Sequence, residues 1–252
     1  HGARLGPEEI ERAKRAMGVP VDEPFYIDPA ATAYFEERRA AWHRQYAAWG
    51  KRYAAWRQDN PQLAQTLDAY LDAGRPWYDD AILPQIAGDE ALSSREVGGR
   101  VLNAYADAVE NLIGGSADLS KSNKTEMPAY GDFRYDNVDG RTIRFGVREH
   151  AMASICSGIA LHGGFRPFCA TLLLFTDYMK PALRLAALMG LPVIYVLTHD
   201  SIYLGGDGPT HQPIEHLNAL RIIPNFRVIR PGDPQETVVA WQMAMERRDG
   251  PT

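Results

Sequence analysis

Cysteine, long apolar runs and excess positive charge are all scarce in this sequence. It holds two cysteines, Cys156 and Cys169, which form no CxxC pair. Two thiols in a chain of this size do not make a disulfide framework, so the sequence predicts a reduced, cytoplasmic protein. No run of about 18 apolar residues occurs, which argues against a membrane span. No apolar leader opens the chain, so no signal peptide is expected.

The charge balance also narrows the class of protein. The sequence has 27 basic and 32 acidic residues, a net charge of −5. That balance provides no broad basic surface, so general nucleic-acid binding is not expected. With 45% hydrophobic and 23% charged residues among 252, the chain has an ordinary globular composition and room for one or two domains. It begins at His1 rather than Met, so we expect a piece of a longer protein.

The first 90 residues read as helices followed by a linker. Helices are expected over 7–17, about 29–60 and 61–73, and the Pro- and Gly-containing stretch 75–90 reads as a linker. In the long helix an Ala-Ala-Trp pattern recurs every seven residues, with Trp at positions 42, 49 and 56. A coiled-coil seam would explain this repeat. Because three heptads are the minimum for a coiled coil, a helix packed along its parent domain is favoured.

From Ser93 onward, short apolar runs alternate with helical patterns. This alternation predicts an α/β fold, a doubly wound and mainly parallel sheet with helices on both faces. The expected strands cover 112–115, 142–146, 166–171, 192–198 and 226–230. The expected helices cover 95–110, 149–161, 175–189, where Pro181 can kink the helix, and 234–248.

Ligands of such sheets bind beyond the carboxyl ends of the strands. Polar, glycine-rich segments stand at those places in this sequence, over 114–123, 146–150, 171–178 and 198–213. The last of these has two histidines, two aspartates and three glycines directly after the most apolar strand. Its histidines do not have a metal-site spacing. A binding loop and a turn capped by Asp and His side chains are both compatible with it.

Two shorter motifs are weaker signals on their own. The glycines of 114–123 would let a ligand approach the strand end, and its hydroxyls and Lys121 favour an anion. No GKS or GKT follows, so the segment is not a P-loop. Glu149 stands at a strand-to-helix junction, where an ordinary acid of a first helical turn is the alternative to a functional carboxyl.

Taken together, the motifs GGSADLSKSN, FGVREHAM, THDSI and DGPTHQP resemble those of transketolases, and so does the segment 171–178. Transketolases use thiamine diphosphate to move two-carbon ketol units. The opening HGARLG resembles the end of that family's first domain. The resemblance implies that residues 1–20 are the tail of the diphosphate-binding domain and 21–90 a helical connecting segment. Residues 91–252 would be the pyrimidine-binding domain, incomplete at its C-terminus.

The resemblance implies a set of cofactor contacts. Glu149 would donate a proton to the pyrimidine ring nitrogen, and Phe175 and Tyr178 would wall the ring. Leu172 stands where many members have phenylalanine, so stacking is expected to differ there. Asp118 matches a residue near the cofactor at the subunit interface. The ligands of the diphosphate-bound Mg²⁺ or Ca²⁺ are expected outside this chain, and no metal ligand is expected within it.

The resemblance also implies which residues meet a sugar phosphate. The expected catalytic residues are Glu149, His211 and His1. The expected substrate-binding residues are His1, Arg95, Ser122, His199, Asp207 and His211. Arginine suits the phosphate end because its donors form a fork. Two departures stand out, since Gly206 replaces a usual glutamate and His150 a phenylalanine of some members.

By the same resemblance, the active site forms between two subunits of a homodimer in the pentose phosphate pathway or the Calvin cycle. Dihydroxyacetone synthase shares much of the motif set and stays an alternative. Deoxyxylulose-phosphate synthase is disfavoured by Ser201-Ile202. A non-catalytic module built on the pyrimidine domain is a third interpretation. Because the diphosphate half is absent, this chain alone is expected to be inactive.

Overall fold

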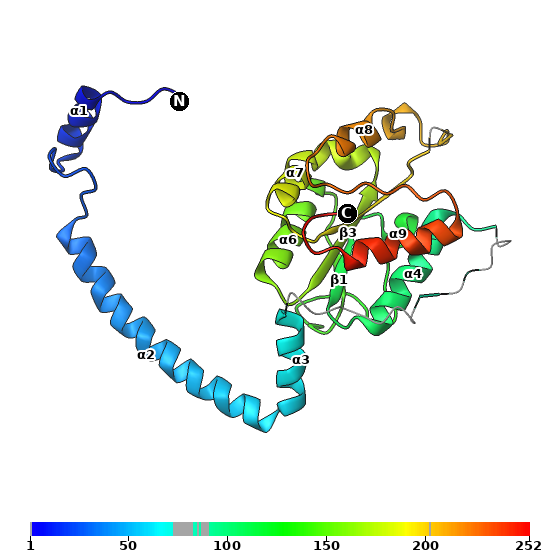
Figure 1. Ribbon diagram of the computed structural model, residues 1–252, viewed down its shortest axis with the longest axis horizontal. Helices are drawn as coiled ribbons and strands as arrows, with labels where there is room; N and C mark the ends of the chain where they lie inside the picture. The colour runs from blue at the N-terminus through cyan, green and yellow to red at the C-terminus, as the bar shows by residue number, and fades with distance from the viewer. Residues whose placement is uncertain (1, 73–82, 85, 87–90, 202) are drawn as a thin grey trace. The chain divides into compact units, whose positions relative to one another are not determined.

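The computed structural model describes residues 2–72, 83–84, 86, 91–201 and 203–252 (Figure 1). The chain divides into two compact units, His1–Ala64 and Gln65–Thr252. Two expectations fall on positions outside the described residues: the role of His1 and most of the predicted linker 75–90. None of the described helices is long and apolar enough to cross a membrane.

The N-terminal helices start and stop where local chemistry requires. Helix α1, Pro7–Met17, ends at Gly18, whose φ of 69° is the left-handed conformation favoured by glycine. Helix α2, Pro29–Asp59, starts where the Asp28 carboxylate accepts a hydrogen bond from the Ala30 amide at 2.7 Å. It ends before Pro61, which opens α3, Pro61–Leu71. The three predicted helices are confirmed to within two residues.

The heptad aromatic residues of α2 stack on one another along the helix. Ring centroids lie 5.7 Å apart for Tyr46 and Trp49, 5.0 Å for Trp49 and Tyr53, and 5.8 Å for Tyr53 and Trp56. No α2 residue is buried among the described residues. The coiled-coil and packed-helix interpretations of the repeat therefore both stay predictions.

The second unit is built on a four-stranded parallel sheet. Its strands are β1 Leu112–Ser116, β2 Thr142–Arg144, β3 Arg166–Leu172 and β4 Ile194–Thr198, in the order β2-β1-β3-β4. Every neighbouring pair is parallel. The Gly114-Gly115 pair of β1 lets the strands approach closely, because a Cβ at Gly115 would lie 1.9 Å from the Ile143 carbonyl oxygen. These glycines are thus needed for the close packing of neighbouring strands.

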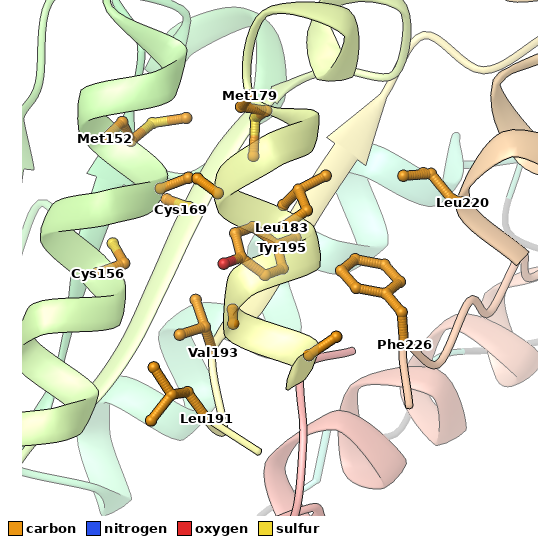
Figure 2. Packing of buried hydrophobic residues seen from close by; sticks show 14 of the residues in the cluster. Met152, Cys156, Cys169, Met179, Leu183, Leu191, Val193, Tyr195, Leu220 and Phe226 are labelled. Carbon is orange, nitrogen blue, oxygen red and sulfur yellow. The ribbon is translucent and has the colours of Figure 1, made fainter. Parts of the chain in front are cut away.

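Helices cover both faces of the sheet, as predicted (Figure 1). Helices α6 Glu149–His162 and α7 Lys180–Leu188 pack on one face, where Figure 2 shows Met152, Cys169, Leu183 and Tyr195 in the core. Helices α4 Ser94–Ala108 and α9 Pro234–Glu246 cover the other. The remaining short helices are α5 Ser120–Asn123, η2 Leu174–Tyr178, η3 Pro209–His211 and α8 His216–Arg221.

Two sequence predictions are wrong in detail. Residues 226–230 are not a strand of the sheet, and the Arg227 amide donates instead to the Pro251 carbonyl at 3.1 Å. The edge of β4 is met by Thr252, whose amide donates to the Val193 carbonyl at 3.1 Å. An apolar pattern predicts burial in an extended form but does not name a pairing partner.

The predicted helix 175–189 is two elements, η2 and α7. Pro181 lies in the first turn of α7, where its missing N–H breaks no helical hydrogen bond. It therefore starts a helix and does not kink one.

Candidate active site

The four strands are parallel, so their carboxyl ends and the segments that follow lie at one edge of the sheet. Strand β1 leads to Asp118 and then α5, β2 to the start of α6, β3 to η2, and β4 to His199. The sequence motifs therefore meet at this edge, as their positions after strands predicted.

His199 is the centre of the best-connected polar cluster at this edge. Its Nε2 lies 3.3 Å from Arg95 Nη1 and 3.2 Å from Ser122 Oγ, while its Nδ1 lies 2.7 Å from Thr198 Oγ1. Arg95 Nη1 also donates to the Ser122 carbonyl at 3.2 Å. Because a guanidinium can only donate, Nε2 must accept, and the ring proton sits on Nδ1. The cluster thus requires a neutral His199.

The electrostatics agree with a neutral ring. The pKa of His199 is lowered, chiefly by burial and then by the Arg95 charge, with Asp207 and Asp200 acting in the opposite direction. The backbone at His199 has φ 57°, a left-handed conformation that is uncommon for a residue with a side chain. Arg230 pairs with the carboxylate of the next residue, Asp200. The left-handed turn at His199 is therefore held by the contacts of the His199 ring and by the ion pair of Asp200 with Arg230.

Aromatic rings form a second group beside this cluster. The rings of Phe175 and Tyr178, both in η2, have centroids 5.8 Å apart. The His211 ring of η3 meets Phe175 edge-on at 5.3 Å. Tyr178 is 62% exposed, so its ring can accept a further contact. The structure brings these three predicted residues together.

Other predicted residues lie in the segments at the carboxyl ends of the strands. Glu149 is the first residue of α6, only 8% exposed, and α6 packs against η2. Leu172 ends β3 and is buried. Asp118 is exposed with φ 62°, and Asp207 is exposed in the loop before η3. A groove of about 690 Å³ is lined by residues of β4, α4 and α9, and its lining includes Arg95, Asn123, His199 and Asp207.

Sequence reasoning missed two supporting contacts. Thr198, which accepts from His199 Nδ1, ends the predicted strand and opens the polar segment 198–213, but the sequence gives it no role of its own. A hydroxyl directly before a loop histidine could have been noted as a partner. The ion pair between Asp200 and Arg230 joins segments 30 residues apart, and no local pattern announces it.

Comparison with known families explains this constellation. Residues 90–252 match the pyrimidine binding domain of transketolase, and residues 1–76 match the transketolase thiamine diphosphate binding domain. The chain belongs to the transketolase family. The transketolase of Geobacillus stearothermophilus is 47% identical over 260 residues, covering 100% of this chain. The chain spans 38% of the length of that relative.

Solved transketolase structures share the fold. Transketolase from Leishmania mexicana superposes with a TM-score of 0.88 at 39% identity, covering 100% of this chain and 38% of that one. A Pichia stipitis transketolase in complex with sedoheptulose-7-phosphate gives 0.86 at 38% identity, with the same coverage. The observed α/β architecture is thus that of transketolases over the whole chain.

Proposed function

We propose that this chain supplies the pyrimidine-binding half of a transketolase active site. The enzyme would transfer a two-carbon ketol unit from a ketose phosphate to an aldose phosphate with thiamine diphosphate. The observation that carries the proposal is the cluster of Arg95, Ser122 and His199 beside the Phe175 and Tyr178 rings at one sheet edge. A phosphorylated polyol and a planar cofactor ring need these two kinds of surface side by side.

The donor set fits an aminopyrimidine ring. Phe175 and Tyr178 offer aromatic faces, and Glu149 offers one buried carboxyl at a helix start that packs against their element. When bound, thiamine diphosphate would supply a carbon nucleophile. The task of Glu149 is to hold a proton toward the ring nitrogen. Leu172 and Asp118 would border the same ring, with Leu172 giving apolar packing in place of aromatic stacking.

The polar cluster suits the sugar. Arg95 has further guanidinium donors for a phosphate, since its contacts with Ser122 and His199 use only Nη1. His199 Nε2 is an acceptor, so it can receive a substrate hydroxyl in place of Ser122 Oγ. His211 would join Arg95 and Ser122 at the phosphate end, and Asp207 would bind the hydroxyl next to the carbonyl. We extend the same proposal to His1 as a contact of the reacting carbonyl.

Several finer points belong to the proposal as well. We propose the domain division at 1–20, 21–90 and 91–252. We also propose a Mg²⁺ or Ca²⁺ ion held by ligands outside this chain, a homodimer with a shared site, and a cytoplasmic location. They rest on the family membership and, for location, on the cysteine count. Dihydroxyacetone synthase chemistry stays an alternative that a substrate panel would separate.

The decisive experiment uses a complete transketolase that contains this chain. Glu149→Gln removes the proton-donating carboxyl at nearly constant volume, so ketol transfer from xylulose 5-phosphate to ribose 5-phosphate should fall by at least about 100-fold. His162→Ala, an exposed change at the far end of α6, is the matched control. Near-normal transfer in Glu149→Gln would contradict the role of Glu149. No transfer in the unmodified enzyme would contradict the function itself.

A further inference from the structure

A buried histidine behind the aromatic group lacks a partner on one side. His216 is the first residue of α8 and is only 2% exposed. Its Nε2 lies 3.2 Å from Asp177 Oδ2, in η2. Its Nδ1 is buried and has no hydrogen-bond partner within the described part of the chain. A buried polar atom without a partner costs free energy, so this nitrogen calls for an explanation.

A second carboxylate lies near that nitrogen. Glu215 Oε2 is 4.0 Å from His216 Nδ1. When Nε2–H donates to Asp177, Nδ1 of the neutral ring carries a lone pair, so this nitrogen and the Glu215 carboxylate are two acceptors close together. A cation between them would satisfy both. One ligand atom from each of Asp177, Glu215 and His216 lies within 4.8 Å of the others.

The dimensions suit a zinc ion. Zinc binds imidazole nitrogen at about 2.0–2.1 Å and carboxylate oxygen at about 2.0–2.2 Å, so two of its ligands lie no more than about 4 Å apart. Glu215 is 71% exposed and can move the small remaining distance. Lys180 Nζ approaches the other Asp177 oxygen, Oδ1, at 3.5 Å, which leaves Oδ2 to face the ring. A carboxylate that fixes the far nitrogen of a ligating histidine is common at zinc sites.

We propose that Asp177, Glu215 and His216 form a binding site for a divalent transition-metal ion, with zinc as the expected occupant. His216 Nδ1 and Glu215 are the ligands. Asp177 orients the ring by accepting from Nε2–H. The ion would tie η2, which carries Phe175 and Tyr178, to the start of α8. This proposal rests on local geometry and does not depend on the proposed enzymatic function.

The test is calorimetric titration of the metal-stripped 252-residue chain with zinc chloride. We expect one zinc ion per chain, and an affinity at least about tenfold lower in Glu215→Gln and in Asp177→Asn. Glu215 makes no capping hydrogen bond with its side chain, so its variant should fold normally. His162→Ala, which removes an exposed histidine of α6, is the matched control and should bind zinc as the parent does.

Three outcomes would overturn the site. The first is no zinc uptake by the parent chain. The second is unchanged affinity in Glu215→Gln, and the third is affinity lost in the His162 control, which would assign binding to surface histidines. Circular dichroism of each variant separates loss of binding from loss of fold.

Discussion

His199 shows how a single residue can link the backbone of a strand end to the polar surface of the site. Its ring bonds to Thr198, Ser122 and Arg95, which belong to three different elements or loops. Burial and the Arg95 charge lower its pKa, so the folded state favours the neutral ring. The ring is therefore prepared as an acceptor before any ligand arrives.

Lowering the pH should reveal this preference. A histidine with a lowered pKa binds its proton first in the unfolded chain, so its stabilising contribution is present above the ordinary pKa of about 6.5 and is lost as the pH falls below it. Nuclear magnetic resonance titration should place the His199 pKa below that value. Arg95→Met should raise it, because a positive neighbour is removed. An unchanged pKa in Arg95→Met would contradict the electrostatic argument.

The glycines of β1 allow a second test at this scale. Gly115→Ala would place a methyl group 1.9 Å from the Ile143 carbonyl oxygen, so the backbone must shift. We expect a loss of roughly 2 kcal/mol or more in the free energy of unfolding. Gly158→Ala is the matched control in α6, where nothing lies within 4 Å. It should stabilise the chain by up to about 1 kcal/mol. Equal effects in urea denaturation would contradict the close approach.

At the scale of the element, capping contacts at helix ends contribute to the stability of the chain. Helix α9 begins at Asp233, whose carboxylate accepts from the Glu236 amide at 2.7 Å. Asp233→Ala should cost about 1 kcal/mol of stability because that amide loses its partner. Denaturant unfolding measures the loss, with the exposed loop residue Asp139 changed to Ala for comparison. A loss no larger than in the Asp139 variant would show that the cap contributes nothing.

The same local chemistry explains which elements the sequence could predict. Helix α2 was predicted closely because Asp28-Pro29 and Asn60-Pro61 mark its two ends. Strand β4 was predicted because its run is apolar on both faces, as in a buried parallel strand. Residues 226–230 also contain three apolar side chains, yet the Arg227 amide donates to the Pro251 carbonyl and the segment is not a strand of the sheet. Which segment fills a sheet edge depends on the rest of the fold.

The sequence could likewise predict only part of the candidate site. Ser122, His199 and Glu149 could be placed at one edge because each follows a parallel strand. The Thr198 partner and the pair between Asp200 and Arg230 could not, since both depend on side-chain directions in three dimensions. The resemblance supplied roles for residues, and the structure added the proton position on His199.

At the scale of the whole molecule, the outer edge of β4 bears on whether the isolated chain forms oligomers. β4 is the last strand in the sheet order, and of the described residues Thr252 meets its outer edge. The groove continues along this edge past Val228 and Trp241. An edge strand that is paired over only part of its length can pair with another chain. We therefore expect the isolated chain to form oligomers between about 1 μM and about 1 mM. Light scattering after gel filtration would test this, and a monomer throughout that range would contradict it.

The parallel register also determines how the chain can reach its fold. Gly114 pairs with Thr142 and Leu112 pairs with Arg166, so each of these pairings within the sheet closes a long loop. The entropy of those loops must be lost before any strand gains a partner, which slows folding. The helices between the strands can form early, while the edge where the site residues gather is complete only when the last strand docks. Refolding of this chain should therefore recover helical signal well before ligand binding.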